Sequence, residues 1–308
     1  NESIRTYAPL FFQTQGRAVT ANDFRSLLRQ ERRGVISKIW GGEDNVPPQY
    51  GRVFVSAYGE EGQLLTSEQK QEIIAFFKSK AVVSILPEFA DPSFVEISLS
   101  DSITIDLDLT YRSRAELEDL VFGFIKNYYH PGFDVSFNLN DMENKIRQLD
   151  NAILGTENID VKLIKNIYAT LSEPVTSVTI NYDNPLSVGG SAGGIVQSVN
   201  SFQAKHPDTG ETISCVVRDR LGIIQLGYAG SGQPPAWGGD VNVDGEVTVV
   251  GSLNRETGTV QIDGVEIYSP FSILARPLNE NVYPKAATVF RLVNDGVTLL
   301  DTSEGEPT

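Results

Sequence analysis

The spacing of apolar residues changes once along this chain, near residue 185. Before that point, segments with an apolar residue every three or four positions alternate with segments in which every second residue is apolar. This mixture predicts helices together with strands. After residue 200, strand-like runs separated by turn-forming dipeptides predominate. The chain is therefore expected to be an α+β protein with several domains and a β-rich C-terminal part.

Three helix starts are marked by pairs that match or resemble the capping box, in which two side chains bond each other's backbone N–H groups. The pairs are Thr20/Asp23, Thr66/Gln69 and Ser113/Glu116. Each precedes an apolar helical face, and a further helix is expected from Asn140. The expected faces are Phe24, Leu27 and Leu28; Ile73, Ile74, Phe76 and Phe77; Leu117, Leu120, Val121, Phe124 and Tyr128; and Met142, Ile146, Leu149 and Ile153.

Strands are expected between these helices. Apolar runs predict strands over Val35–Trp40, Val53–Ala57 and Val82–Leu86. Residues 97–109 close this α/β part, because Ile103, Ile105, Leu107 and Leu109 alternate there with polar residues as in a half-buried strand. Val175, Val178, Ile180 and Tyr182 suggest a further strand.

Three Asp-Gly dipeptides mark the C-terminal part, beginning at Asp244, Asp263 and Asp295. β-Branched residues flank each of them. Around Asp263 the pattern predicts two strands joined by a two-residue hairpin turn.

These patterns divide the chain into consecutive segments. Residues 17–110 read as an α/β unit, residues 111–184 as a mixed helical and β segment, residues 185–200 as a Gly-rich connector, and residues 201–308 as a β-rich domain. Residues 1–16 form an apolar lead-in. Its residues Ile4, Tyr7, Ala8, Phe11 and Phe12 share one helical face, and Pro9 limits the helix length. The absence of a starting Met and this lead-in predict a fragment of a longer or processed protein.

The net charge of the chain argues against two classes of partner, nucleic acids and anionic membranes. Against 25 Lys and Arg stand 40 Asp and Glu, a net charge of −15. Such a chain lacks the basic surface that nucleic acids require, and anionic membranes would repel it. No apolar run approaches a membrane-spanning length. The one cysteine, Cys215, is expected to be a small buried hydrophobic residue, and only two histidines are available for chemistry. A soluble protein without cofactors is expected.

Gly189-x-Ser191-x-Gly193 matches the nucleophile elbow of serine hydrolases, which requires a strand before the serine and a helix after it. The serine instead lies in a run of small residues, and His206 follows without an intervening acid, so a flexible loop is the preferred interpretation. Paired acids such as Asp106 with Asp108 could serve a glycosidase. Acids at these positions are also ordinary on a solvent face. A hydrolase remains the enzymatic alternative.

Asp240, Asn242 and Asp244 resemble the first half of a calcium-binding loop. The twelfth position of that loop, which should supply a bidentate carboxylate, is Gly251. A hairpin turn with solvated acids explains the same residues. A calcium- or glycan-binding β module is therefore kept as an alternative, and no metal site is predicted.

Both tryptophans precede two glycines and an acid, in Trp40-Gly41-Gly42-Glu43 and Trp237-Gly238-Gly239-Asp240. Each lies near a Pro-Pro pair. Large aromatic residues on such loops could anchor an interface, or could fold back onto their own domain. The candidate interface residues are Trp40, Pro47, Pro48, Tyr50 and Trp237.

The stretch from Arg17 to Phe54, densest in Trp40-Gly41-Gly42-Glu43-Asp44-Asn45, resembles the baseplate wedge subunit of contractile-tailed, T-even-type bacteriophages. This is the gene-6-product family, related to the J-like baseplate proteins. The resemblance is dense over residues 17–57 and specific in the Trp-Gly-Gly-Glu-Asp-Asn stretch. It is looser to about residue 184 and only general over the β-rich part.

This resemblance implies a structural protein rather than an enzyme. Members of the family form homodimers, bind other wedge subunits and join neighbouring wedges into the ring around the tail hub, which rearranges on sheath contraction. The implied location is the virion tail baseplate, assembled in the host cytoplasm. The resemblance also implies that residues 17–110 are an α/β domain inserted into a domain made of residues 1–16 and 111–184, and that the chain is a C-terminal fragment.

Overall fold

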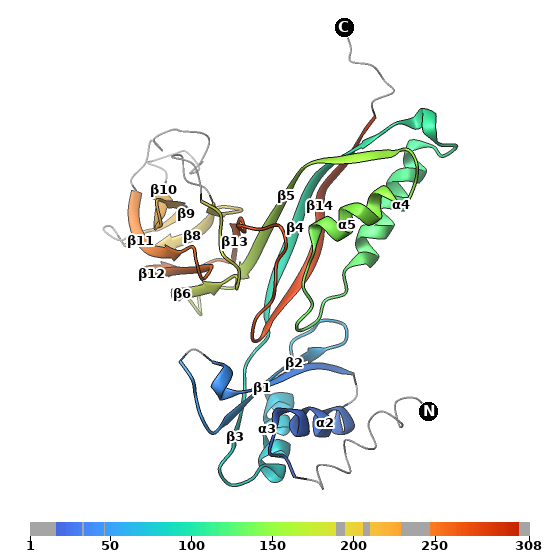
Figure 1. Ribbon diagram of the computed structural model, residues 1–308. Helices are drawn as coiled ribbons and strands as arrows, with labels where there is room; N and C mark the ends of the chain where they lie inside the picture. Colours follow the sequence, from blue (N-terminus) through green and yellow to red (C-terminus); the bar gives the residue numbers. More distant parts are fainter. Residues whose placement is uncertain are drawn as a thin grey trace. The chain divides into compact units, whose positions relative to one another are not determined.

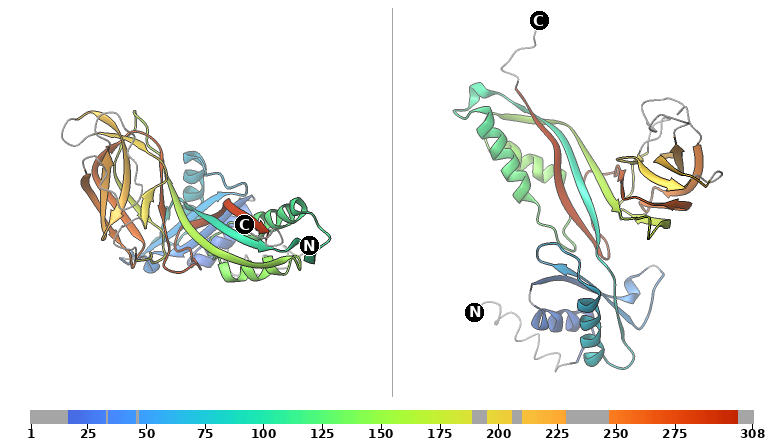
Figure 2. Two further views of the ribbon diagram at one scale, coloured as in Figure 1. Left: turned by 90° about the horizontal axis from the view of Figure 1, so that it is seen from above. Right: turned by 180° about the vertical axis from the view of Figure 1, so that it is seen from behind.

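The computed structural model describes residues 17–32, 34–45, 47–188, 195–205, 210–228 and 247–301. They form two compact units, and the fold is mixed α+β with strands predominating (Figures 1 and 2). The first unit contains the described residues up to Ser93 together with Gly132–Asp134 and Lys285–Val289. The second unit contains the other described residues. Among the described residues, no helix is long and apolar enough to span a bilayer.

The first unit is a three-stranded sheet with two helices on one of its faces (Figure 1). Strand β2 lies in the centre, antiparallel to β1 and parallel to β3. The core between the helices and the sheet contains the edge-to-face pair Phe24 and Phe77, whose ring centroids are 5.0 Å apart. The elements are α2 (Ala21–Glu31), β1 (Val35–Gly41), β2 (Arg52–Gly59), α3 (Ser67–Lys80) and β3 (Leu86–Phe89).

The second unit contains one eleven-stranded sheet that forms two parts. One part is a long ribbon in the order β5-β4-β14, and two helices lie on one of its faces (Figure 2). Leu117 and Val121 from the first helix and Met142 from the second bury their side chains in the same core as the ribbon. The ribbon elements are β4 (Ser93–Ile105), α4 (Arg114–Tyr128), α5 (Leu139–Arg147), β5 (Ile153–Ile167) and β14 (Thr288–Asp301).

The other part of the second unit is a barrel in which β10 pairs with both β9 and β11. Strand β12 joins β11 to β8, and β8 returns to β9, so these five strands close on themselves. Strands β7 and β13 connect β9 to β5 of the ribbon. The remaining elements are β6 (Val175–Asn181), β7 (Val196–Ser198), β8 (Phe202–Lys205), β9 (Thr212–Arg220), β10 (Ile223–Tyr228), β11 (Val247–Asn254), β12 (Thr259–Ile267) and β13 (Phe271–Ala275).

The capping boxes expected from the sequence are confirmed. In all three, the Ser or Thr side chain accepts from the backbone N–H three residues later, and that residue's side chain accepts in return. The buried state expected for Cys215 is also confirmed. The helix expected from Asn140 begins one residue earlier, because Asn138 is its N-cap.

Several strand predictions were wrong. Residues 82–85 form a turn, and the strand expected there begins only at Leu86. Strand β4 ends at Ile105, because the side chain of Asp106 accepts from the backbone N–H of Asp108 and starts the 3-10 turn η2 (Leu107–Leu109). The fifteen-residue strand β5 was not expected, and Ile153 belongs to it rather than to the preceding helix.

The hairpin expected at Asp263 is also absent. Strand β12 continues through this dipeptide, with Gly264 at φ +74° and a register shift against β6 between Asp263 and Ile267. The sequence signal therefore marks a bulge. Asp295 likewise lies inside β14, and Asp244 lies outside the described residues.

The two compact units differ from the domain boundaries read from the sequence. The chain passes from the first unit to the second near Ser93 rather than at residue 110. The reason is that β4, which begins there, pairs with β5 of the second unit along most of its length. The described ends of the Gly-rich connector are not a free linker, because Leu186 and Val196 are buried. The C-terminal strand β14 returns to the ribbon instead of staying with the barrel.

Candidate interaction surface

The loop between β1 and β2 depends on Gly42, which starts the 3-10 turn η1 (Gly42–Asp44). The N–H of Gln49 donates to the carbonyl oxygen of Gly42 at 2.7 Å and closes the loop. A Cβ atom on Gly42 would lie 2.0 Å from the carbonyl oxygen of Gln49, so only glycine fits there. The Trp-Gly-Gly-Glu-Asp-Asn stretch therefore folds a tight loop at this end of the sheet.

Trp40 holds this loop from inside its own unit. Its indole N–H donates to the side-chain oxygen of Asn45 at 2.9 Å, and its ring stacks on Phe54 with the centroids 5.7 Å apart. The side chain is half-buried. Its position matches the interpretation that this tryptophan folds back on its own domain, so it positions the loop rather than projecting from it.

The apex of the loop is exposed. Pro47 and Pro48 both face solvent, and the Tyr50 side chain is 81% exposed. Proline fixes the backbone, and tyrosine presents a large contact area with few rotatable bonds. Three of the five candidate interface residues are therefore exposed on one loop.

A second exposed connection adjoins this loop. The N–H of Leu86 donates to the carbonyl oxygen of Gly51 at 2.9 Å, and this bond holds the start of β3 beside the loop. Val83 in this connection is fully exposed, and Leu86 is 55% exposed. Sequence reasoning missed both residues, because it placed the run 82–86 in an apolar strand.

We call these five side chains the Tyr50 patch: Pro47, Pro48, Tyr50, Val83 and Leu86. Apolar side chains that gather on a surface commonly mark a protein–protein contact. The ion pair between Arg52 and Glu88 on the adjacent strands β2 and β3 borders the patch with charged groups. The arrangement suits an interface with an apolar centre and a polar rim.

A second exposed apolar group lies at the end of the ribbon where α4 begins, and we call it the ribbon-tip patch. The ion pair Arg112–Asp150, at 3.0 Å, and the bond from the Arg114 side chain to the Leu299 carbonyl oxygen, at 2.7 Å, bring three segments together there. The exposed side chains of the patch are Leu109, Tyr111, Leu154 and Leu300.

The remaining candidates from the sequence lie outside the described residues. They are Trp237, the possible calcium ligands Asp240, Asn242 and Asp244, and the hydrolase candidates Ser191 and His206. Within the described part of the chain, no group of three or more His, Cys, Asp or Glu side chains could hold a metal ion.

Three acids of the kind considered for a glycosidase pair, Asp106 and two on α4, have structural partners. Asp106 caps the 3-10 turn before α4. Hydrogen bonds from the backbone N–H and then the hydroxyl of Ser113 lower the pKa of Glu116, the capping-box acid of α4. Glu118 pairs with Arg114 along the same helix. These carboxylates stabilise local structure.

Comparison with known proteins agrees with the resemblance read from the sequence. Residues 20–90 match the family described as baseplate structural protein gp6, C-terminal domain I. Over 212 residues the chain is 23% identical to the baseplate wedge protein gp6 of Enterobacteria phage T4. This alignment covers 68% of the chain and 31% of the T4 protein, so the chain spans about a third of that relative. The resemblance to the gp6 baseplate wedge proteins that the sequence indicated is confirmed.

Proposed function

We propose that this gp6-like chain is a structural component of a phage tail baseplate wedge and acts entirely through its interfaces. In this proposal it forms a homodimer, binds other wedge subunits and links neighbouring wedges into the ring around the tail hub. It makes no contact with nucleic acid or membrane. The observation that carries the proposal is the Tyr50 patch, which lies within the residues that match gp6 domain I.

The construction of the patch supports this role. Its apex residues lie on a loop that Trp40 and Gly42 fix in place, so little entropy is lost when the loop enters an interface. Exposed tyrosine is among the residues that contribute most to binding when it becomes buried. The charge balance of the first unit also favours association between copies of it, because the unit has no net charge to repel a second copy. Residues 17–93 carry ten basic and ten acidic side chains, so they contribute nothing to the net charge of −15.

Two separate patches fit the need for two kinds of contact. A protein that both dimerises and joins a ring needs one self-complementary surface and at least one other. We assign the Tyr50 patch to the first contact and the ribbon-tip patch to other wedge subunits. Each unit has its own hydrophobic core. In this proposal the contacts rearrange on sheath contraction while both cores stay intact.

The test uses the variant Tyr50→Ser. Sedimentation equilibrium at micromolar concentration should show a dimer for the wild-type chain and at least about 30-fold weaker association for the variant, the loss typical of a central tyrosine. The matched control is Tyr168→Ser, because Tyr168 is 79% exposed and lies in the second unit outside both patches. Its dimer should be unchanged.

Reconstitution with the other wedge subunits tests the second assignment. Tyr111→Ser should reduce wedge assembly and leave the dimer intact. A monomeric wild-type chain, or a Tyr50→Ser chain that dimerises and assembles normally, would contradict the assignment of the Tyr50 patch. Normal incorporation into particles of a variant in which both patches are altered would contradict the assignment of both contacts. A wild-type chain that is never incorporated into particles would contradict the proposal as a whole.

A further inference from the structure

Helix α3 is apolar around its whole circumference in its central part. Residues 73–77 are Ile-Ile-Ala-Phe-Phe, and successive residues on a helix are about 100° apart, so these five side chains point in every direction. Ile73 and Phe77 are buried against the sheet, whereas Ile74 and Phe76 are half-buried and Ala75 is exposed. A helix that is apolar all round is normally covered on all sides.

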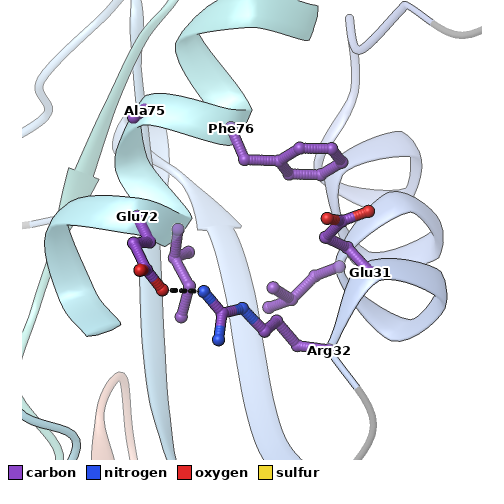
Figure 3. Close-up of a pocket in the computed structure, with 7 residues that line it drawn as sticks. Glu31, Arg32, Glu72, Ala75 and Phe76 are labelled. Carbon is purple, nitrogen blue, oxygen red and sulfur yellow. Dashed lines mark hydrogen bonds and ion pairs between the residues drawn. The ribbon is translucent and has the colours of Figure 1, made fainter. Parts of the chain in front are cut away.

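The uncovered side of α3 is hollowed along its contact with α2. We call this cavity of about 270 Å³ the α2–α3 groove. Figure 3 shows the Phe76 ring extending from α3 toward α2, and Arg32 reaching from the end of α2 to its ion-pair partner Glu72. Leu28 and Ile73 line the groove, and charged groups stand at its edges.

A shallower hollow of about 310 Å³ lies on the other side of α3, beside Phe89 of β3. Ala75 borders both hollows, and the apolar part of the second is formed by Ile74 and Phe89. Lys70 and Lys78 stand at its edge. The small side chain of Ala75 between two hollows lets another segment of chain approach α3 closely.

The chain itself enters the first unit next to this surface. The N–H of Ala18 donates to the carbonyl oxygen of Lys80 at 2.9 Å, and Ala18 forms a parallel bridge with Ala81. Residue 17 is therefore fixed at the C-terminal end of α3. The sixteen residues before it include Ile4, Tyr7, Ala8, Phe11 and Phe12, an apolar set at helical spacing.

We infer that the apolar side chains of residues 4–12 dock on the outer face of α3, over Ala75 and into the α2–α3 groove. The geometry allows it. Ala75 lies five residues before Lys80, about 7 Å along the helix. Residues 13–17 can span about 16 Å when extended, so the segment reaches the groove without disturbing Ala18.

The contact would need little intrinsic affinity, because a short tether gives the segment a local concentration of roughly millimolar. Docking places the aromatic rings of the segment against Ile74 and Phe76 and removes both surfaces from water. Pro9 does not oppose this contact, because the docking needs only the apolar side chains just before and just after the proline and not one continuous helix. This inference is independent of the baseplate proposal, and either can fail alone.

Disulfide trapping tests the inference in the full chain. The native Cys215 does not interfere, because it is buried and burial raises the pKa of its thiol to about 12. The test pair is Phe11→Cys with Ala75→Cys. The control pair is Phe11→Cys with Ala115→Cys. Ala115 matches Ala75 because it is also an exposed alanine on a helix, but it lies on α4. The control also probes the arrangement implied by the family resemblance, in which residues 1–16 join residues 111–184.

Under mild oxidation the test pair should close a bond within one chain at least about tenfold faster than the control pair, as proximity predicts. A mixture of the two single variants, Phe11→Cys and Ala75→Cys, should form few bonds between chains. Equal rates for the two pairs, faster closure of the control pair, or closure mainly between chains would each overturn the inference. The last result would mean that a second copy occupies the groove.

A second measurement guards against oxidation artefacts. The variant Ala75→Arg fills the surface between the two hollows with a long charged side chain. Limited proteolysis within residues 1–16 should then be at least about tenfold faster than in the wild-type chain, because a docked segment is protected from cleavage. Ala115→Arg is the matched control and should leave the cleavage rate unchanged. Equal cleavage rates in all three chains would contradict docking.

Discussion

The carboxylate of Asp219, which has no exposed surface, accepts a hydrogen bond from the backbone N–H of Val196 at 2.8 Å. Its other oxygen lies 3.4 Å from the guanidinium of Arg255. These residues belong to β9, to β7 and to the connection between β11 and β12. One buried acid therefore joins two segments of the barrel to the adjoining strand β7.

Replacing this acid should destabilise the second unit strongly. Asp219→Ala leaves the Val196 N–H without this acceptor and a partly buried cation without this carboxylate. The expected loss in the free energy of unfolding is about 3 kcal/mol or more, as for other broken buried pairs. Asp219→Asn, which keeps an acceptor oxygen, should lose less. Urea unfolding followed by circular dichroism measures both.

The control is Asp119→Ala, which removes an exposed acid on α4. It should change the stability by no more than about 0.5 kcal/mol. If Asp219→Ala unfolded at the same urea concentration as this control, the buried carboxylate would not hold the barrel together.

Local signals in the sequence predicted the helices well, because a capping box needs only residues three positions apart. The long strand β5 was missed for the opposite reason. Its buried members include Ile153, Val161 and Leu163, whereas Leu154 is exposed and Ile164 is only half-buried. The pairing of β5 with β4 and β13, far away in the sequence, determines that pattern.

The Tyr50 patch was predictable only in part. Pro47, Pro48 and Tyr50 follow a loop motif whose turn residues are visible in the sequence. Val83 and Leu86 join them through a parallel strand pairing between β2 and β3, which nothing local specifies. The Asp-Gly dipeptide was ambiguous in the same way. The Asp263-Gly264 pair predicted a hairpin turn but forms a bulge, and the two structures favour the same residues.

The loop that carries Tyr50 should depend on Asn45. Asn45→Ala removes the acceptor for the Trp40 indole and should cost about 1 kcal/mol, the usual net value of one such hydrogen bond. Amide hydrogen exchange at Gln49 should become faster, because its bond to Gly42 closes the same loop. Asn127→Ala, which removes an exposed hydrogen bond on α4, should not affect exchange at Gln49. Unchanged exchange in Asn45→Ala would show that the loop is held by other contacts.

The contact between α4 and α5 should depend on pH. Hydrogen bonds from Lys145 and then Tyr128 lower the pKa of Asp141 below its usual 3.8. A carboxyl whose pKa is lower in the folded state stabilises that state above its unfolded pKa, and the contribution disappears as the pH falls below about 3.8 through the folded value. Asp141→Asn should therefore lower the unfolding temperature at pH 7 and have little effect at pH 2.

Tyr128 in the same cluster should show the opposite dependence. Burial, and then its hydrogen bond to Asp141, raise the pKa of the Tyr128 phenol above the ordinary value of 10.0. The stabilisation is fully present below pH 10 and is lost as the pH rises further. Tyr128→Phe should be less stable than wild type at pH 7, and this difference should shrink above pH 10. A difference that stayed constant in both variants across the whole pH range would exclude the cluster as the cause.

Two glycines of the second unit share a left-handed backbone and differ in the space around them. Gly258 has φ +70°, and a Cβ there would lie 2.1 Å from the carbonyl oxygen of Asn184. Gly264 has φ +74° and nothing within 4 Å of the same position. Gly264→Ala should therefore cost only the backbone strain, about 1 kcal/mol. Gly258→Ala should lose about 2 kcal/mol more, because the clash displaces a buried segment.

Asn184 explains why that displacement would be costly. Its side chain donates to the carbonyl oxygens of Tyr182 and Tyr283 and accepts from the N–H of Tyr283, so it holds two distant segments together. Thermal unfolding of the two alanine variants, measured side by side, separates strain from steric overlap, because the backbone conformation is nearly the same in both. Equal unfolding temperatures would mean that the Asn184 segment moves aside freely and does not anchor this part of the barrel.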